Sequence, residues 1–318
     1  LVREIFSSRY LTNGGSQHKA LELALSEKLG TPNLRLFTNG HLALECAIQA
    51  MSLTPGEIIT TPFTFISTTH AIVRCGFTPV FCDVEPDYFT MDPALLEQLI
   101  TPRTRAILPV HVYGNPCDMD AIDAIAARHN LPVLYDAAHA FGVSVNGRAV
   151  ADFGTASMFS FHATKCYNTI EGGAIATRDA DYAELLNGYK NFGFHADDEI
   201  REVGGNAKMN EFQAAMGLLN LKHFEGQIAK RGKVAARYRE NLFGVAGLSF
   251  RPVRPGATQN YAYLPVSFDP AVFGADRDQV SDTLRTYNIF ARKYFYPLTS
   301  ESACYKGQFD PSETPVAL

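Results

Sequence analysis

Short apolar runs alternate with amphipathic segments over the first half of the chain. The apolar runs have the length and composition of strands covered on both faces, and they lie at residues 34–37, 57–61, 78–84, 105–112, 131–136, 157–161 and 173–178. Segments with apolar residues at helical spacing lie between them, at 41–51, 67–76, 92–100 and 119–130. This alternation and the right-handed crossover rule predict an α/β domain with a mainly parallel sheet covered by helices.

The pattern changes beyond residue 210. Residues 210–242 have the spacing of a long helix, with a candidate break near Gly226. Strand-like runs at 261–268 and 289–295 follow, with a helical pattern at 278–288 between them. We therefore predict two domains, a large α/β domain over residues 1–220 and a smaller α+β domain over 221–318, with the N-terminal segment as a candidate contact of the smaller one.

Composition and charge contribute mainly by exclusion. A formal net charge of −5 gives no electrostatic reason to expect nucleic acid or an anionic membrane as a partner. The six cysteines form no CxxC pair, which argues against a disulfide framework or a zinc site and favours a reducing compartment. No apolar run approaches the roughly 20 residues that span a bilayer, and the first residues lack the pattern of a signal peptide. We expect a cytoplasmic protein.

Two predicted strands end in residues that suit a phosphate and a cation. Thr38, Asn39 and Gly40 follow the first strand and lead into a helix, where exposed amides and a hydroxyl suit a phosphate; taken alone, an ordinary helix cap is the better interpretation. Asp136 closes an apolar strand, and burying its carboxylate requires a cationic or hydrogen-bonding partner. A protonated pyridine nitrogen would serve, as would a structural salt bridge or a helix cap.

Lys165 lies among apolar and small residues, 29 positions after Asp136. Desolvation disfavours the ammonium form of such a lysine and makes it a better imine-forming nucleophile, although most lysines are solvated surface charges. Ser160, five positions earlier, is a candidate phosphate ligand or an ordinary strand serine. Phe65 is a candidate for stacking on a flat heterocycle, with a place in the core as the alternative.

The order of these candidates favours one cofactor. His111, His139 and His162 lack the spacing of metal ligands, so we expect no metal site. A phosphate cradle, an aromatic ring, a strand-end Asp and then a Lys form one set for pyridoxal phosphate. In that set Asp136 keeps the ring nitrogen protonated, and the ring then acts as an electron sink.

The sequence resembles the DegT/DnrJ/StrS family of sugar aminotransferases, which have fold type I of the pyridoxal-phosphate enzymes. The resemblance covers most of the chain in family order, with matching runs at 57–72, 79–87, 106–122, 133–142, 160–175 and 206–218. It implies that Lys165 forms the Schiff base and that Asp136 pairs with the pyridine nitrogen. It also implies further contacts with the cofactor, by His139 beside the ring hydroxyl, by Phe65 on the ring, and by Thr38, Asn39 and Ser160 on the phosphate.

Asn191 matches an asparagine that reaches the phosphate of the neighbouring subunit, so the resemblance implies a homodimer with shared active sites. Some members of the family carry His in place of the lysine and are dehydratases, whereas Lys165 implies transamination. SFHATKCYNTIEGG, at 160–173, is closer to the family's C-4 enzymes than to its C-3 enzymes. The resemblance therefore implies a VioA-type enzyme, which transfers the amino group of L-glutamate to C-4 of dTDP-4-dehydro-6-deoxyglucose.

Two departures from the family pattern and several alternatives stay open. Lys208 stands where relatives have Arg, and Lys cannot reproduce a bidentate guanidinium contact. The chain stops at Leu318, so we expect either a trimmed sequence or a reduced small domain. A C-3 enzyme, a UDP- or GDP-sugar enzyme, a lyase or racemase on the same fold, and a non-catalytic regulator are the rivals. The stereochemistry of the new amine and the pathway of the product, whether O-antigen of lipopolysaccharide, another glycan or an antibiotic, are not determined by the sequence.

Overall fold

The computed structural model describes residues 1–195 and 199–318. Its centre is a mixed sheet in the order β1-β9-β8-β5-β4-β2-β3, in which parallel bridges at Ile107–Val133 and Val110–Asp136 join β4 to β5. β9 runs antiparallel to both β1 and β8, whereas the other pairs in this sheet are parallel. The strands are β1 (Asn33–Phe37), β2 (Glu57–Thr60), β3 (Thr78–Phe81), β4 (Thr104–Ile107), β5 (Leu134–Asp136), β8 (Ala156–Ser160) and β9 (Gly173–Thr177).

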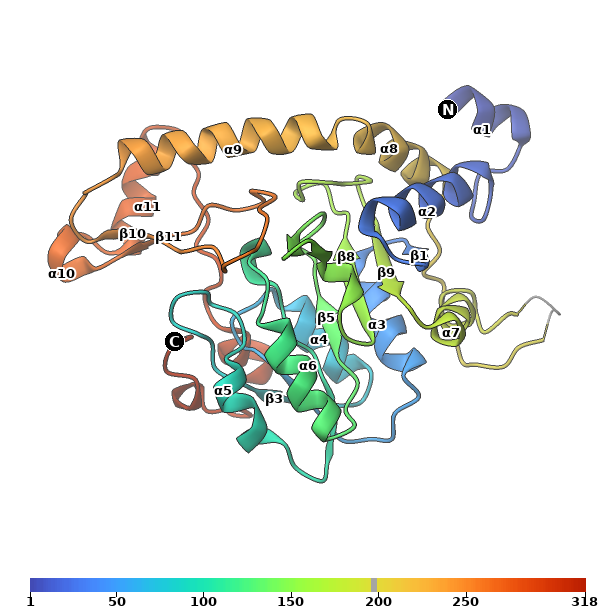
Figure 1. Cartoon of the computed structure of the whole chain (residues 1–318), viewed down its shortest axis with the longest axis horizontal. Coiled ribbons are helices and arrows are strands. Elements are labelled where there is room, and N and C mark those ends of the chain that lie inside the picture. The colour runs from blue at the N-terminus through green and yellow to red at the C-terminus, as the bar shows by residue number, and fades with distance from the viewer. Residues whose placement is uncertain (196–198) are drawn as a thin grey trace.

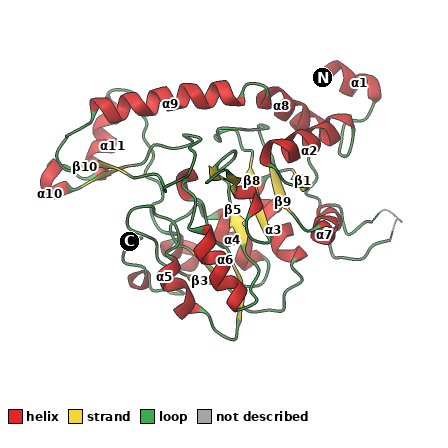
Figure 2. Cartoon of the chain, viewed as in Figure 1, coloured by secondary structure: helices red, strands yellow, loops and turns green. Residues whose placement is uncertain are grey.

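Helices cover both faces of the sheet (Figure 2). Alternate residues of one strand point to opposite faces, so that Leu36 and Ile59 pack into one core while Phe37 and Ile58 pack into the other. The helices of this part of the chain are α1 (Val2–Ser8), α2 (Ser16–Leu29), α3 (Gly40–Ala50), α4 (Ser67–Arg74), α5 (Pro93–Leu96), α6 (Met119–Arg128) and α7 (Ala180–Lys190). The hairpin strands β6 (Ser144–Val145) and β7 (Arg148–Ala149) lie outside the sheet.

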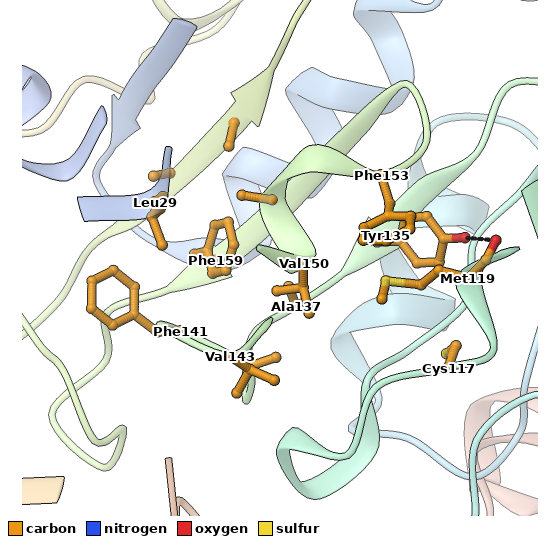
Figure 3. Packing of buried hydrophobic residues seen from close by; sticks show 14 of the residues in the cluster. Leu29, Cys117, Met119, Tyr135, Ala137, Phe141, Val143, Val150, Phe153 and Phe159 are labelled. Carbon is orange, nitrogen blue, oxygen red and sulfur yellow. Dashed lines mark hydrogen bonds between the residues drawn. The ribbon is translucent and has the colours of Figure 1, made fainter. Parts of the chain in front are cut away.

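The larger of the two cores places buried aromatic rings beside the strands that lead to the site (Figure 3). Tyr135 of β5 is fully buried, and its hydroxyl donates a hydrogen bond of 2.7 Å to Asp123 of α6. Phe141 stacks on Tyr167 with ring centroids 4.4 Å apart. Tyr135 comes directly before Asp136, and Tyr167 lies two residues after Lys165. The packing of these two rings therefore fixes the backbone that carries both candidate residues.

The last third of the chain leaves the sheet along a long helix (Figure 1). α8 (Glu211–Leu221) is followed by α9 (Phe224–Asn241), which leads to the two-stranded sheet of β10 (Leu248–Phe250) and β11 (Val266–Phe268) and to the helices α10 (Pro270–Phe273) and α11 (Arg277–Thr286). Residues 298–318 then return to the large sheet, where Asp83, after β3, accepts hydrogen bonds of 2.9 Å from the amides of Val316 and Ala317.

The predicted elements of the large sheet are confirmed, each within a few residues of its expected bounds. The break expected near Gly226 falls at residues 222–223, between α8 and α9, and Gly226 itself lies inside α9. Two expectations for the rest of the chain are wrong. Residues 289–295 form no strand, and the strand expected at 261–268 is limited to β11. In the described residues, no helix is both long and apolar enough to cross a membrane.

Candidate active site

Asp136 lies at the carboxyl end of β5 and is buried. Its Oδ2 accepts a hydrogen bond of 2.8 Å from the Thr68 hydroxyl, and its Oδ1 accepts one of 3.0 Å from the amide of Ala138. Burial raises the pKa of this carboxyl, and the two hydrogen bonds and the charge of Lys165 oppose that rise only in part. Asp136 is therefore a fixed, desolvated acceptor that gains from a cation placed beside it.

Lys165 lies in the loop that follows β8, and its amide donates a hydrogen bond of 2.9 Å to the carbonyl of His162. Burial lowers the pKa of its ammonium group, and the negative charge of Asp136 acts in the opposite direction. The charge of Lys165 in turn lowers the pKa of both Asp136 and His139. The structure thus brings three of the predicted residues together from two separate segments of the chain, residues 136–139 and the loop after β8.

His139 is buried next to these two residues. Its Nδ1 accepts a hydrogen bond of 3.1 Å from the amide of Tyr113, so that Nε2 carries the proton of the neutral ring and faces the Tyr263 hydroxyl at 3.4 Å. The ring of Phe295 is stacked on that of His139, with centroids 5.8 Å apart and planes 4° apart. Burial holds the pKa of His139 well below its usual range, and Lys165 lowers it further. His139 is therefore a neutral hydrogen-bond donor.

The predicted phosphate-binding residues meet where α3 begins. The Asn39 side chain caps this helix by accepting a hydrogen bond of 2.8 Å from the Leu42 amide. A Cβ added at Gly40 would lie 3.0 Å from Cβ of Ser160, so the end of β8 touches the start of α3. The amide of Thr38 donates a hydrogen bond of 2.8 Å to the carbonyl of Ala207. The helix start, with its positive dipole end and the Ser160 hydroxyl beside it, suits an anionic group.

Phe65 and Asn191 lie differently. Phe65 precedes α4 by two residues and is 54% exposed, and its carbonyl accepts a hydrogen bond from the amide of Thr68. The backbone of Phe65 is thus anchored next to the residue that holds Asp136. Asn191 caps the carboxyl end of α7 and pairs with Asn206 in an antiparallel bridge. Over the described residues, no hydrogen bond or ion pair joins Asn191 to Lys165 of the same chain.

Several residues at the site were not predicted from the sequence. Thr68 supplies the hydroxyl that binds Asp136, and the aromatic residues Tyr263 and Phe295 contact His139. Gln213 donates hydrogen bonds to the carbonyls of Thr38 (3.2 Å) and Glu171 (2.8 Å). The STT run that contains Thr68 and the tyrosines near residue 263 are ordinary in isolation. Only their contacts across the fold distinguish them.

These residues fit pyridoxal phosphate. In the described part of the chain, Asp136 has no ion-pair partner within 4 Å, and a pyridinium nitrogen supplies the cation that the buried carboxylate requires. The neutral His139 donor suits a ring oxygen, and the start of α3 suits a phosphate. Lys165 supplies an amine whose uncharged form burial favours. Each polar part of the cofactor therefore has a partner of the right chemistry.

Comparison with known proteins gives one consistent result. The model of the DegT/DnrJ/EryC1/StrS aminotransferase family matches residues 1–318. The dTDP-4-amino-4,6-dideoxy-D-glucose transaminase of Escherichia coli is 42% identical over 314 residues, which cover 98% of this chain and 84% of the relative. The GDP-perosamine synthase of Caulobacter vibrioides is 34% identical over 303 residues, which cover 93% of this chain and 81% of the relative.

Solved structures agree in fold. The structure of DesI with its TDP-sugar product superposes with a TM-score of 0.94 at 36% identity and covers 99% of this chain and 81% of its own. The structure of DesV from S. venezuelae, in complex with a ketimine intermediate, superposes with a TM-score of 0.92 at 31% identity, over 99% of this chain and 84% of its own. The predicted fold type I architecture is therefore confirmed.

Proposed function

Because the chain belongs to the DegT/DnrJ/EryC1/StrS aminotransferase family and is a pyridoxal-phosphate-dependent sugar aminotransferase, we propose that it transfers the amino group of L-glutamate to C-4 of a nucleotide-linked 4-keto-6-deoxy sugar. The proposed substrate is dTDP-4-dehydro-6-deoxy-D-glucose, and the product is a 4-amino-4,6-dideoxy sugar. The similarity to the E. coli transaminase over nearly the whole chain supports this choice. The observation that carries the proposal is the convergence of Lys165, Asp136 and His139.

Each residue of the cluster has a distinct proposed task. When bound, the cofactor supplies an electron sink that stabilises negative charge on the substrate carbon. Asp136, fixed by Thr68 and Ala138, would hold a proton on the ring nitrogen. His139, with Nδ1 held by the Tyr113 amide, would donate from Nε2 to the oxygen on the ring. Both side chains have their own hydrogen-bond partners, so they are oriented before the cofactor binds.

Lys165 is the proposed covalent anchor of the cofactor and the group that moves the proton. Burial lowers the pKa of its amine, so a larger fraction is uncharged near neutral pH and available as a nucleophile and base. Once its amine is free, Lys165 would take the proton from the substrate carbon in the half of a ping-pong reaction that consumes glutamate. In the other half it would supply the proton to the carbon of the sugar that is aminated.

Thr38, Asn39 and Ser160 are the proposed phosphate ligands, and Phe65 is the proposed ring that stacks on the cofactor. The convergence of β8 with the start of α3 supports the first assignment. The exposure of Phe65, beside the Thr68 that anchors Asp136, supports the second. Asn191 is proposed to reach the phosphate of a neighbouring subunit. Its position at the end of α7, apart from Lys165 of its own chain, is consistent with that role.

A narrow pocket with a basic and aromatic lining lies next to the cluster. Arg239 and Arg251 line it together with Tyr88, Tyr113 and Tyr263, and no carboxylate lies among the described residues that line it. Guanidinium groups bind diphosphates, and aromatic rings stack on bases. Tyr113 and Tyr263 also contact His139, so the pocket opens beside the proposed reaction centre. We therefore propose that this basic and aromatic lining contacts the nucleotide part of the substrate.

The substrate is tested by a panel of nucleotide keto-sugars offered with L-glutamate. We expect the dTDP-4-keto-6-deoxy sugar to give the highest kcat/KM, with the amine found at C-4 by NMR and the mass of the product fixed by mass spectrometry. Amination at C-3, or a preference for a UDP- or GDP-linked sugar, would contradict the proposed substrate and favour another member of the same family. Lys165→Ala protein is the negative control for each substrate.

A further inference from the structure

The outer edge of β1 is covered by an ion pair outside the site, in which the Lys190 side chain is 9% exposed and that of Glu22 is 23% exposed. β1 is the last strand of the sheet, so Leu36 presents its N–H and C=O groups away from β9. The Leu36 amide donates a hydrogen bond of 3.1 Å to Glu22 Oε1, and the Leu36 carbonyl accepts one of 3.3 Å from Lys190 Nζ. Glu22 Oε1 and Lys190 Nζ lie 3.7 Å apart. One acid and one base thus satisfy both free groups of this residue.

A buried ammonium group such as that of Lys190 is unusual in a residue that only stabilises the fold. Its side chain is 9% exposed, and its Nζ lies 5.5 Å from the centroid of the Phe37 ring. Burying an ammonium group is costly unless it is paired and hydrogen-bonded. An apolar residue could cover the edge of β1 at lower cost, but it would leave the carbonyl of Leu36 without a donor. The pair therefore fixes the position of one specific backbone unit.

Leu36 lies two residues before Thr38, the first residue of the proposed phosphate cradle, which consists of Thr38, Asn39 and Ser160. Beyond Leu36 the edge of β1 continues, because the Thr38 amide donates to the Ala207 carbonyl at 2.8 Å. Ala207 is itself tied to Lys190, since its amide donates a hydrogen bond of 2.9 Å to the Lys190 carbonyl. The side chain of Lys190 thus holds the strand before the cradle, and its backbone holds the segment that binds Thr38.

The same residue also fixes the base of Asn191. Asn191 follows Lys190 directly and pairs with Asn206, the residue before Ala207. On either side of this bridge, the Gly205 amide donates to the Tyr189 carbonyl and the Phe192 amide donates to the Gly205 carbonyl, each at 2.8 Å. Any shift of Lys190 would therefore move both Asn191 and Thr38.

We propose that Glu22 and Lys190 are a positioning pair that acts on two active sites of the dimer at once. The pair fixes the position of Thr38 in the phosphate cradle of its own subunit, and it fixes the position of Asn191, which reaches the cradle of the neighbouring subunit. The inference rests on the proposed function, since it takes Thr38 and Asn191 as phosphate ligands of different subunits. Neither Glu22 nor Lys190 touches the cofactor, so both act through other residues.

The first test compares cofactor affinity with stability. Lys190→Met removes the donor to Leu36 and leaves Glu22 unpaired. We expect its dissociation constant for pyridoxal phosphate to rise about tenfold or more, the size expected for one lost hydrogen bond to a charged group. Lys190→Arg, which keeps the charge, should restore most of the affinity, and Lys230→Met, an exposed lysine of α9, is the matched control. Unchanged affinity in Lys190→Met, with a lower unfolding midpoint of the cofactor-free protein, would overturn the proposal.

Glu22→Gln provides a milder variant if Lys190→Met does not fold. Its amide oxygen still accepts from Leu36, but the charge that faces Lys190 is lost. We expect an intermediate loss of cofactor affinity with a native circular dichroism spectrum. An affinity equal to that of the wild type in Glu22→Gln would count against the pair. Turnover of glutamate by wild-type protein is measured first, because its absence would refute the proposed function and not the role of the pair.

Mixed dimers separate the two effects of Lys190. A Lys165→Ala subunit leaves one working site, which contains Lys165 of the other subunit. In one dimer Lys190→Met is placed in the subunit that keeps Lys165, and in the other it is placed in the Lys165→Ala subunit. We expect both dimers to fall below the control dimer with wild-type Lys190 in kcat per working site and in cofactor affinity. A loss confined to the first dimer would overturn action across the interface.

Discussion

At the scale of single residues, the site depends on how strongly its charged groups are held before a cofactor binds. Asp136 has a carboxylate fixed by a hydroxyl and an amide, and burial raises its pKa. Lys165 is an amine whose pKa burial lowers. The two pKa values shift in opposite directions, and burial thereby favours the neutral form of both groups. The apo site is therefore poised for a cationic ring that restores the charge on Asp136.

Thr68 allows this balance to be tested. The Thr68 hydroxyl stabilises the charged form of Asp136, so Thr68→Val should raise the already raised pKa of that carboxyl further. Because an acid with a raised pKa loses its charged form at a higher pH, the acid limb of cofactor binding should move to higher pH, by about one unit for one hydrogen bond to a charged group. The measurement is the pH dependence of the cofactor dissociation constant.

Thr69→Val is the matched control for that experiment. Thr69 is equally buried, but its hydroxyl bonds to Thr299 and not to Asp136. It should leave the acid limb in place even if it lowers stability. An acid limb that stays unmoved in Thr68→Val, or that moves equally in both variants, would show that Thr68 does not set the charge of Asp136.

At the scale of secondary structure elements, the site is made by contacts between strand ends and helix starts. β9 is antiparallel to its neighbours and approaches the start of α3 closely at Gly173. A Cβ at this position would lie 2.7 Å from the Asn39 carbonyl and 2.8 Å from the Gly40 amide, both of which are backbone atoms. Glycine is required here because the cradle leaves no space for a side chain.

Gly173→Ala should therefore disturb the phosphate cradle. Overpacking of this kind costs about 1–3 kcal/mol, and here it acts on the backbone that is proposed to bind the phosphate. We expect cofactor affinity to fall about tenfold or more, as measured by titration of the apo protein. Gly205→Ala is the control, since nothing lies within 4 Å of a Cβ added there. If Gly173→Ala and Gly205→Ala bound the cofactor alike, the proposed position of the cradle would be wrong.

The elements of the large sheet were predictable from sequence because their signals are local. Runs such as 57–61 and 131–136 carry apolar residues at successive positions, and these residues pack into both cores of the molecule. Residues 289–295 have similar composition but form no strand, because Phe295 packs against His139 and Tyr113 instead of pairing with a neighbouring chain segment. Tertiary contacts therefore decide the structure of this segment, and the periodicity of the sequence does not reveal them.

The candidate site was predictable only in part, for a related reason. Lys165 and Asp136 follow apolar strands, and the resemblance to a family assigned their roles before any geometry was known. Thr68 and Tyr263 gave no such signal, since a threonine in a helix and a tyrosine in a loop are common. Their contribution comes from segments 68 and 124 positions away from the residues that they contact.

At the scale of the whole molecule, exposed apolar side chains gather on the segment after α7. Phe192, Phe194, Ile200 and Val203 are each exposed by at least 41%, and Val203 by 96%. Patches of this kind mark interfaces, and the segment includes Asn191, the residue proposed to reach a neighbouring subunit. We propose a homodimer in which this segment packs against a second copy of the chain.

Val203→Glu tests the position of that interface. A charge buried against the second subunit is costly, so we expect the dimer dissociation constant, measured by analytical ultracentrifugation, to rise about tenfold or more and activity to fall in parallel. Phe243→Glu is the matched control, because Phe243 is 90% exposed and lies just beyond the carboxyl end of α9, far from α7 (Figure 1). Equal dimer stability in the two variants would place the interface elsewhere.

The central claim is that Lys165 anchors pyridoxal phosphate and moves the proton of a transamination. The most direct measurement is the visible absorption spectrum of purified protein reconstituted with pyridoxal phosphate, recorded before and after addition of L-glutamate alone. We expect the wild-type protein to show the absorption band of lysine-bound cofactor. Glutamate should convert this cofactor to the pyridoxamine form, with release of one 2-oxoglutarate per site. We expect neither the band nor turnover in Lys165→Ala. A Lys165→Ala protein that completed both half-reactions at the wild-type rate would contradict the central claim.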